Sequence, residues 1–438
     1  MNAIAAYADS LCQRTRNLEI WEWQGRVSRV NGLLVESYGP PASVGDLCRI
    51  RSRNGIEVPV EVVGFDDGKL LLMALETFKG IEAGCPVLLQ SREGMVSVGS
   101  GMLGRVIDGL GRPLDDKGPV LAEHPVPLDC DPPAPMSRPL ITEVEETGIR
   151  AIDSFIALGK GQRLGIFAGS GVGKSTLLGM LIRNRTSGIN VIALVGERGR
   201  ELNEFIHHDL GAAGMERTVV VVSTSDQAAP LRIRAARMAM SIAEHFRDAG
   251  EDVVFMMDSL TRLAYAQREI GLASGEPPTT RGYTPSVFTL LPRLLERAGT
   301  SPKGNITGLY TVLVDGGDMD EPVADSVRGI LDGHLLLDRN LATGGFYPPI
   351  DILGSVSRLD RKVCSPEETA ITLKARNLLA TYRKNEDLVV IGAYRRGTNP
   401  ELDKAINFHD RIRNYLVQTP EERTSRQETF QTLASMIP

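Results

Sequence analysis

The chain has 438 residues, a length that corresponds to roughly three domains. Hydrophobic residues make up 42% and charged residues 24%, which is ordinary globular usage and excludes a disordered chain, a collagen-like chain and a coiled coil. The 49 basic and 55 acidic residues give a net charge of −6, which argues against general binding to nucleic acid backbones, because such binding depends on clustered Lys and Arg.

The cysteines and the hydropathy pattern indicate a protein of the reducing cytosol. Stretches of roughly 18 apolar residues, which a membrane span requires, are absent from the sequence, as is an N-terminal leader pattern. Any membrane association is expected to be peripheral and to come through partners. The cysteines are odd in number, scattered and never in a C-x-x-C pair, so they predict neither a disulfide framework nor a zinc site: Cys12, Cys48, Cys85, Cys130 and Cys364.

Residues 1–18 place apolar side chains at helical spacing, which predicts a short amphipathic helix that can dock a partner. A frayed tail, or a strip packed on its own domain, is the alternative. Residues 19–98 contain short β-branched runs separated by Gly, Pro and Asn-Gly turns, which predicts a small β-barrel. Residues 1–100 hold 10 basic and 12 acidic residues, so we interpret the barrel as a structural collar and not as a nucleic-acid-binding surface.

Residues 99–360 alternate apolar, β-rich runs with helical stretches, at 163–168, 190–195, 218–223, 252–257 and 308–314. This alternation predicts an α/β fold with a central, mostly parallel sheet covered on both faces. Ligands of such sheets bind beyond the carboxyl ends of the strands, so the residues that follow each run are the candidates for chemistry.

Residues 361–438 predict a small helical domain. Segments 365–368 and 419–422 both read as capping boxes with proline at the first helical position, and Asn399-Pro400 opens a further helix.

The strongest motif lies between the first of these runs and a helix expected to start near Gly173. It differs from the G-x-x-x-x-G-K-[ST] pattern only in having Ala168 at the first glycine position. Its backbone N–H groups can surround phosphate oxygens, while Lys174 reaches the β- and γ-phosphates and Ser175 ligates Mg²⁺. The alternative is a glycine-rich turn with a solvated lysine. The expected ATP-binding residues are Ala168, Gly169, Ser170, Gly171, Val172, Gly173, Lys174, Ser175 and Thr176.

A carboxylate that organises the metal is expected at the end of another apolar strand. Asp258 ends the run 253–258 and lies 84 residues after Lys174 (258 − 174). We expect it to hold Mg²⁺ through water, although a lone Asp at a strand end is more often a helix N-cap.

The run that ends at Val195 leads into Gly196-Glu197-Arg198, at the same edge of the predicted sheet. Hydrolysis of a phosphoanhydride needs a group that orients and polarises water, and Glu197 is the candidate general base. The alternative is that Glu197 and Arg198 form a salt-bridged helix start.

Two further candidates lie in the segment 345–358. Tyr347 precedes two prolines that stiffen the chain, so its ring can stack on adenine, although a tyrosine in this setting is usually core packing. Arg358 can act as an arginine finger that stabilises charge on the transferred phosphoryl group.

Together these motifs resemble the catalytic chain of the rotary-type ATPase superfamily, and within it most closely the flagellar type III export ATPases, followed by their relatives in injectisome secretion systems. The resemblance covers nearly the whole chain. The superfamily likeness rests on GSGVGKST at 169–176, GER at 196–198, MMDSLTR at 256–262, PSVFTLLPRLLERAG at 285–299 and PPIDILGSVSR at 348–358. The closer likeness rests on FAGSGVGKS at 167–175, GERGRE at 196–201, YAQREIGLASGEPP at 265–278, ILDGHLLL at 330–337 and VIGAYRRGTNPELDKAI at 390–406.

The resemblance implies a Mg²⁺-dependent ATPase that forms a ring of six identical chains, with sites at the subunit interfaces. It implies that Arg198 lies against the γ-phosphate, that Tyr347 borders the adenine and that Arg358 acts from the neighbouring subunit. It also implies a regulatory partner at the N-terminal helix, and a stalk protein, an export gate and chaperone–substrate complexes at the C-terminal domain. The expected location is the cytoplasmic side of the membrane at the export apparatus.

The sequence therefore predicts an ATPase that assists flagellar protein export by engaging substrates and releasing chaperones. An injectisome ATPase and a catalytic subunit of a rotary ATP synthase stay open as alternatives. A ring-shaped nucleic acid translocase is disfavoured by the acidic barrel, and a regulatory subunit that binds ATP without turnover is disfavoured by the presence of Glu197.

Overall fold

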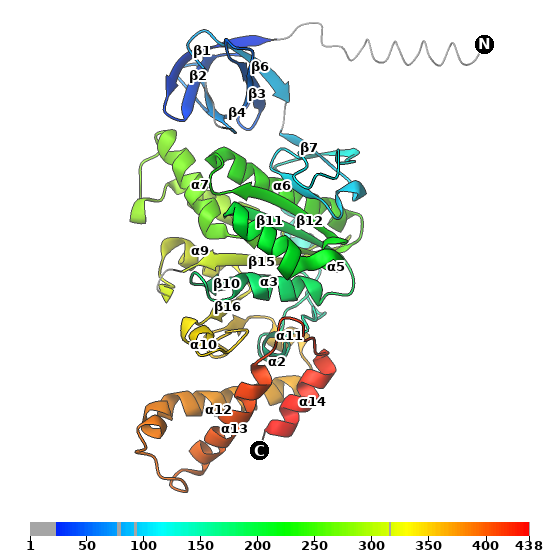
Figure 1. Ribbon diagram of the computed structural model, residues 1–438, viewed down its shortest axis with the longest axis vertical. Coiled ribbons are helices and arrows are strands. Elements are labelled where there is room, and N and C mark those ends of the chain that lie inside the picture. Colours follow the sequence, from blue (N-terminus) through cyan, green and yellow to red (C-terminus); the bar gives the residue numbers. More distant parts are fainter. Residues whose placement is uncertain (1–22, 77–79, 92–93, 315–316, 438) are drawn as a thin grey trace, which may run out of the picture. The chain divides into compact units, whose positions relative to one another are not determined.

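The structure is a computed structural model that describes residues 23–76, 80–91, 94–314 and 317–437 (Figure 1). The helix predicted at 1–18, and Cys12 within it, lie outside the described residues. The chain divides into two compact units, Met1–Met95 and Val96–Pro438, which are described separately.

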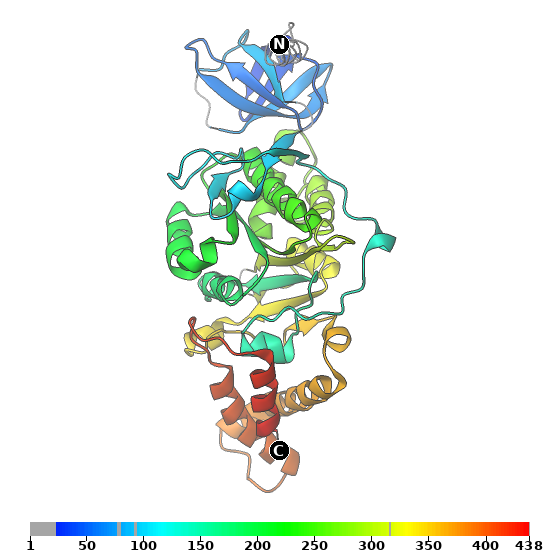
Figure 2. The ribbon, with the colours of Figure 1, turned by 90° about the vertical axis from the view of Figure 1, so that its right-hand side faces the viewer.

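The first unit contains a closed barrel of six antiparallel strands in the order β1-β2-β5-β4-β3-β6, drawn in blue in Figure 2. Side chains alternate along the strands, so that in β4 Val58, Val60 and Val62 point into the barrel and are buried. The barrel predicted from the spaced β-branched runs is confirmed. Its strands are β1 (Gln24–Asn31), β2 (Leu34–Tyr38), β3 (Leu47–Arg51), β4 (Glu57–Asp66), β5 (Lys69–Ala74) and β6 (Pro86–Ser91).

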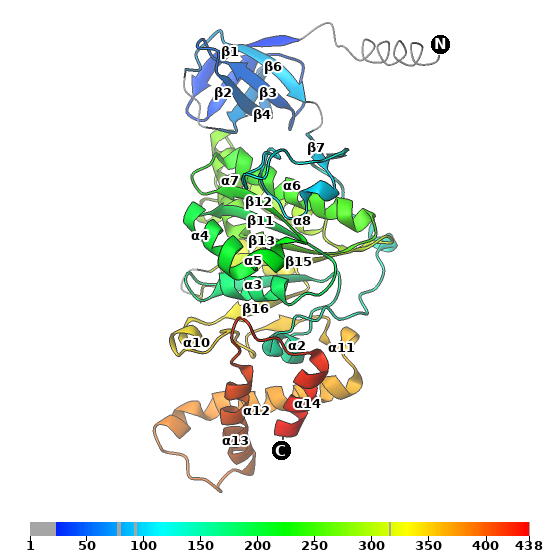
Figure 3. The ribbon, with the colours of Figure 1, turned by 45° about the vertical axis from the view of Figure 1, so that its right-hand side comes forward.

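The second unit is built on a sheet in the order β17-β16-β10-β15-β13-β11-β12-β8, whose inner strands are all parallel. Figure 3 shows β12, β11, β13 and β15 one after another. The predicted mostly parallel sheet is confirmed, and each of the five apolar runs lies on one of its strands. The strands are β8 (Val106–Asp108), β10 (Arg163–Ala168), β11 (Ile189–Glu197), β12 (Thr218–Thr224), β13 (Asp252–Asp258), β15 (Asn305–Leu313) and β16 (Gly333–Leu337), with the short antiparallel β14 (Gly299–Thr300) and β17 (Val356–Ser357); β7 (Met95–Val98) and β9 (His124–Pro127) form a separate pair.

Both faces of this sheet are buried, which explains why its strands are apolar throughout. In β11, Val191, Ala193 and Val195 belong to one hydrophobic cluster, whereas Ile192 and Leu194 belong to another. The first cluster is completed by α6 (Ala229–Asp248), α7 (Leu260–Ala273), α8 (Pro285–Leu295) and α9 (Pro322–Ile330). The second is completed by α2 (Arg150–Phe155), α3 (Lys174–Arg183), η3 (Phe205–Leu210) and the C-terminal helices α12 (Pro366–Val390), α13 (Pro400–Leu416) and α14 (Arg426–Met436).

Short helical elements connect these layers. They are η1 (Ser100–Met102), η2 (Pro135–Ser137), α4 (Gly199–Glu204), α5 (Gly211–Met215), η4 (Thr280–Gly282), α10 (Arg339–Thr343) and α11 (Asp360–Val363). Among the described residues, every helix is too short or too polar to cross a bilayer.

The C-terminal helices are present, and two of their predicted starts are confirmed: a capping box at Ser365 precedes α12, and the Asn399 side chain caps α13. The helix start predicted at 419–422 is wrong, because that segment forms only a turn and α14 begins at Arg426. Tertiary contacts hold the segment 419–422 in this turn. The Gln418 side chain donates to the carbonyls of Gly148 and Glu422, and the Thr424 N–H donates to the Gly148 carbonyl. The domain boundaries predicted at 18, 98 and 360 stay predictions.

The largest fully buried charged side chain in the described part of the chain is Arg297, whose side chain is 2% exposed. Its guanidinium donates to both carboxylate oxygens of Glu244, at 2.9 and 2.6 Å, and to the Leu128 carbonyl at 3.0 Å. These bonds join α6, the residues just after α8 and the segment that follows β9.

Glu244→Ala is expected to lower the free energy of unfolding by about 3–5 kcal/mol, because it leaves the Arg297 cation buried and unpaired. Glu401→Ala breaks the exposed pair with Lys404 and is the control, with an expected change within about 0.5 kcal/mol. Chemical denaturation followed by circular dichroism measures both. Equal small effects would show that the buried pair contributes little.

Candidate active site

The phosphate-binding motif forms the connection between β10 and α3. Gly171 and Gly173 take left-handed backbone angles, with φ of +75° and +86°, which fold the loop back over the first turn of α3. The structure describes every residue of the first turn of α3, and no side chain caps this turn. Its N–H groups are therefore free to bind an anion. Ala168 is completely buried within the second hydrophobic cluster, and its methyl group is accommodated where the motif usually has glycine.

Lys174 lies between two carboxylates from neighbouring strands of the sheet. Its Nζ is 2.5 Å from Asp258 Oδ1, at the end of β13, and 3.5 Å from Glu197 Oε1, at the end of β11. The Thr311 hydroxyl donates to the same Asp258 oxygen at 2.7 Å. Residues 84 positions apart are thus brought into contact, because the carboxyl ends of parallel strands share one edge of the sheet.

Arg262 is the functional candidate that the sequence reasoning missed. Its guanidinium is 3.2 Å from Glu197 Oε2 and also donates to the Gly196 carbonyl. It comes from the first turn of α7, which begins directly after Asp258 and is capped by Ser259. The motif MMDSLTR contains this arginine, and the available signal was its position, four residues after the metal-organising Asp258 at a helix start.

The surroundings of Glu197 raise the pKa of its carboxyl group to near neutral pH. Burial, followed by the nearby charge of Asp258, raises the pKa of Glu197 to about 7, although Lys174 and Arg262 act in the opposite direction. Burial lowers the pKa of Lys174, but the carboxylates of Asp258 and Glu197 outweigh it and raise the pKa above its ordinary value. A carboxyl with such a pKa is suited to take a proton from water near pH 7.

The other predicted residues are placed at different distances from this cluster. Ser175 is exposed in the first turn of α3, next to Lys174 and Thr176. The Tyr347 side chain is 44% exposed, and a Cβ added at Gly173 would lie 3.2 Å from its ring, so the ring borders the phosphate loop. Arg198 is not part of the cluster: its side chain is 75% exposed and pairs with Glu201 at 3.0 Å.

Arg358 lies at the opposite end of β10 from the phosphate loop. Its N–H donates to the Asp332 carbonyl, and the Asp332 N–H donates to the carbonyl of Arg163, the first residue of β10. The phosphate loop follows Ala168, the last residue of that strand, so about 16 Å of strand separates the two ends. Arg358 therefore cannot serve the phosphate loop of its own chain.

The residues present fit a nucleotide with a divalent cation. The loop offers free N–H groups, Lys174 offers a cation and Ser175 a hydroxyl, and Asp258 offers an oxygen ligand. Among the described residues, the structure contains no group of three His, Cys, Asp or Glu side chains that could hold a metal ion by itself. A Mg²⁺ ion here would therefore be held jointly by the protein and by phosphate oxygens.

Gly173→Ala and Gly171→Ala form a matched pair. Each places a side chain at positive φ, which is expected to cost about 1–2 kcal/mol of folding stability. The added Cβ meets the Tyr347 ring only at position 173, since nothing lies within 4 Å at position 171. Gly173→Ala is therefore expected to cost about 0.5–1 kcal/mol more, because the ring must shift by a few tenths of an ångström and strain its side-chain torsion angles. Denaturation curves measure this difference, and it should disappear in a Tyr347→Ala background; if it persists there, Tyr347 does not lie against the loop.

Comparison with known proteins gives matches along most of the chain. Residues 148–357 match the nucleotide-binding domain of the ATP synthase alpha/beta family, residues 27–89 match its beta-barrel domain, and residues 364–435 match the C-terminal domain of the type III secretion ATPase EscN. The flagellum-specific ATP synthase of Bacillus subtilis is 52% identical over 94% of both chains, and that of Treponema pallidum is 48% identical over 98% of this chain and 97% of its own.

Injectisome proteins are similar as well. The type 3 secretion system ATPase of Xanthomonas euvesicatoria is 46% identical over 94% of this chain and 93% of its own. The assembled ATPase EscN of enteropathogenic E. coli superimposes with a TM-score of 0.90 at 41% identity, over 94% of this chain and all of that one. The chain therefore belongs to the family of flagellum-specific ATP synthases and type III secretion ATPases, within the ATP synthase alpha/beta superfamily, and is an ATP-hydrolysing enzyme.

Proposed function

We propose that this chain is the Mg²⁺-dependent ATPase of a flagellar protein export apparatus and that it works as a ring of six identical copies. The observation that carries the proposal is the geometry around β10. Lys174, Asp258 and Glu197 meet at its carboxyl end, whereas Arg358 lies at its amino end, where only another chain's nucleotide can reach it.

In this proposal each residue of the cluster has one task. The N–H groups of residues 169–176 and the Lys174 ammonium bind the phosphates, and Ser175 and Asp258 would hold Mg²⁺, which would supply positive charge to the phosphates. Glu197 orients a water molecule and accepts its proton as the water oxygen bonds to the γ-phosphorus. The bond from that phosphorus to the β–γ bridging oxygen breaks, which releases ADP and phosphate. Arg262 holds the Glu197 carboxylate through its 3.2 Å contact.

Three residues need the assembled, loaded site for their tasks. Arg198 leaves Glu201 and turns to the γ-phosphate, which is a small change because that pair is exposed and weak. Tyr347 covers the adenine from beside the phosphate loop. Arg358 enters the site of the neighbouring chain, where its planar cation stabilises the charge on the transferred phosphoryl group.

Two of the flagellum-specific relatives favour the flagellar assignment, while the two groups overlap in identity, since the flagellum-specific protein of Aquifex aeolicus is 43% identical and a secretion ATPase reaches 46%. The flagellum-specific relatives from Bacillus and Treponema are 52% and 48% identical to this chain, whereas the secretion ATPase of Xanthomonas is 46% and EscN 41% identical. A structure of EscN with its central stalk EscO superimposes on this chain with a TM-score of 0.88. By analogy, a stalk protein, the export gate and chaperone–substrate complexes bind on the side of the C-terminal helices, and a regulatory partner binds residues 1–18. The ring then acts at the cytoplasmic face of the membrane.

Glu197→Gln is expected to lower the turnover rate by about 10²–10⁴-fold while nucleotide binding persists, because only the proton acceptor is removed. Steady-state hydrolysis and binding of a fluorescent ATP analogue measure the two effects. Glu204→Gln, which removes an exposed carboxylate that pairs with Arg200 on the same helix, is the control and should keep most of the activity.

The pH dependence gives a second view of the same residue. With a Glu197 pKa of about 7 in the free enzyme, kcat/KM should fall about tenfold per pH unit below that value, because only the carboxylate accepts a proton. Arg262→Gln removes a charge that lowers this pKa, so the acid limb should move to higher pH. Hydrolysis that survives Glu197→Gln, or an acid limb that stays in place, would contradict the assigned base.

The site between chains is tested by mixing two inactive variants. Lys174→Ala chains lack a working phosphate loop but keep Arg358, and Arg358→Ala chains have the converse defect. In random mixed rings about a quarter of the interfaces combine an intact loop with an intact arginine, so a corresponding share of the hydrolysis should return. A mixture as inactive as its components would show that Arg358 does not act across an interface.

A further inference from the structure

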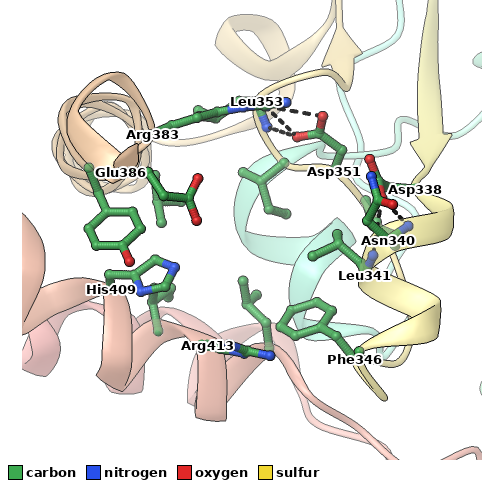
Figure 4. Close-up of a pocket in the computed structure, with 17 residues that line it drawn as sticks. Asp338, Asn340, Leu341, Phe346, Asp351, Leu353, Arg383, Glu386, His409 and Arg413 are labelled. Atoms are coloured by element: carbon green, nitrogen blue, oxygen red, sulfur yellow. Dashed lines mark hydrogen bonds and ion pairs between the residues drawn. The ribbon is translucent and has the colours of Figure 1, made fainter. Parts of the chain in front are cut away.

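A second cavity of about 320 Å³ lies in the same unit, away from the phosphate loop, between α10 with the segment that follows it and the helices α12 and α13 (Figure 4). Its volume is within the range of small-molecule sites, at the lower end. The floor is apolar and is formed by Leu341, Phe346, Ile350, Leu379, Ile412 and Leu416.

Most polar groups at the rim are already used within the protein. The Arg383 guanidinium pairs with both oxygens of Asp351 at 3.1 Å, and the Asp338 carboxylate accepts from the N–H groups of Asn340 and Leu341 at the start of α10. These contacts hold the two sides of the cavity together and leave these charges satisfied.

Two rim charges of opposite sign are left over. Glu386 projects from α12 and Arg413 from α13, as Figure 4 shows, and among the described residues neither makes an ion pair or a side-chain hydrogen bond. Arg413 lies on the α10 side, where one guanidinium nitrogen is 3.9 Å from the position of a Cβ on Gly344. Between them, His409 stacks on Tyr382 at 3.7 Å between ring centroids, and its Nδ1 lies 3.6 Å from the Asp410 carboxylate.

The wall of this cavity is also a wall of the nucleotide site. In α10, Arg339 donates to the Ser170 carbonyl of the phosphate loop at 3.2 Å, while Leu341, two residues on, faces the cavity. Phe346 lines the cavity, and its neighbour Tyr347 borders Gly173. A single segment, 338–347, therefore contacts the phosphate loop with some side chains and the cavity with others.

We propose that this cavity binds a small organic anion with an apolar body, and that its occupancy is coupled to the nucleotide site through the segment 338–347. The apolar body lies on the floor, and the anionic group pairs with Arg413. Glu386 repels that group from the α12 side and so selects one orientation. A ligand that pushes on Leu341 and Phe346 displaces Arg339 and Tyr347 and so changes the affinity for nucleotide. Nucleotide binding changes the affinity of the cavity for its ligand by the same free energy.

Two fluorescent probes that differ in charge test the proposal on the full chain: anilinonaphthalene sulfonate, which is anionic, and phenylnaphthylamine, which is its neutral analogue. Arg413→Gln should weaken sulfonate binding about fivefold and Glu386→Gln should strengthen it about twofold, whereas the neutral probe should respond to neither. Arg396→Gln, at an exposed arginine outside the cavity, is the control. Equal responses of the two probes would overturn the assigned ligand charge.

Two cavity-filling variants locate the binding. Leu341→Trp from α10 and Leu379→Trp from α12 should each weaken both probes at least about tenfold, with thermal unfolding midpoints that show intact folding. Probe binding that is unchanged in both would overturn the site.

The coupling is read from probe affinity with and without a non-hydrolysable ATP analogue. A change of about fivefold or more, lost in Arg339→Ala, is expected. A probe affinity that is the same with and without the ATP analogue would overturn the coupling. Because the probe signal does not depend on hydrolysis, these failures would leave the proposed ATPase mechanism untouched.

Discussion

The buried charge cluster of Lys174, Asp258 and Glu197 is the constraint on which the rest of the active site depends. Two carboxylates at the end of a sheet repel each other, and burial makes each more costly to ionise. Lys174 offsets both, at 2.5 and 3.5 Å, and this requires α3 to start directly at the carboxyl ends of β11 and β13. The parallel pairing of these strands, and the left-handed glycines before α3, both serve that placement.

The same cluster defines what nucleotide binding must change. In the free chain Lys174 contacts both carboxylates, so in the proposed mechanism incoming phosphates compete with Asp258 and Glu197 for one ammonium group. In that mechanism, when Lys174 turns toward phosphate, Glu197 keeps the side-chain contact with Arg262 at 3.2 Å. Burial and the Asp258 charge raise the Glu197 pKa, and Arg262 is a charge that opposes this rise, so Arg262 keeps the proton acceptor from becoming too basic when substrate binds.

Features with a local cause could be predicted from the sequence, and features that depend on register or tertiary contacts could not. The barrel, the parallel sheet and the phosphate loop follow from periodicity and glycine spacing, which act over a few residues. The contact between Arg262 and Glu197 depends on the register of β13 against β11, which pairs Leu194 with Asp258. The capping sequence at 419–422 is sound locally, but bonds to residue 148 prevent the helix from starting there.

The position of Arg358 has a mechanical consequence for a ring. β10 is a buried strand with unbroken pairing to β15 and β16, so it is rigid. The phosphate loop lies at its carboxyl end, and the contacts among Arg163, Asp332 and Arg358 lie at its amino end. In the proposed ring, a chain whose Arg358 contacts the γ-phosphate in the neighbouring site transmits force to the amino end of its own β10. Hydrolysis in the neighbouring site removes that contact with the γ-phosphate. The change is transmitted along β10 to the chain's own phosphate loop, so hydrolysis can proceed sequentially around the ring in one direction.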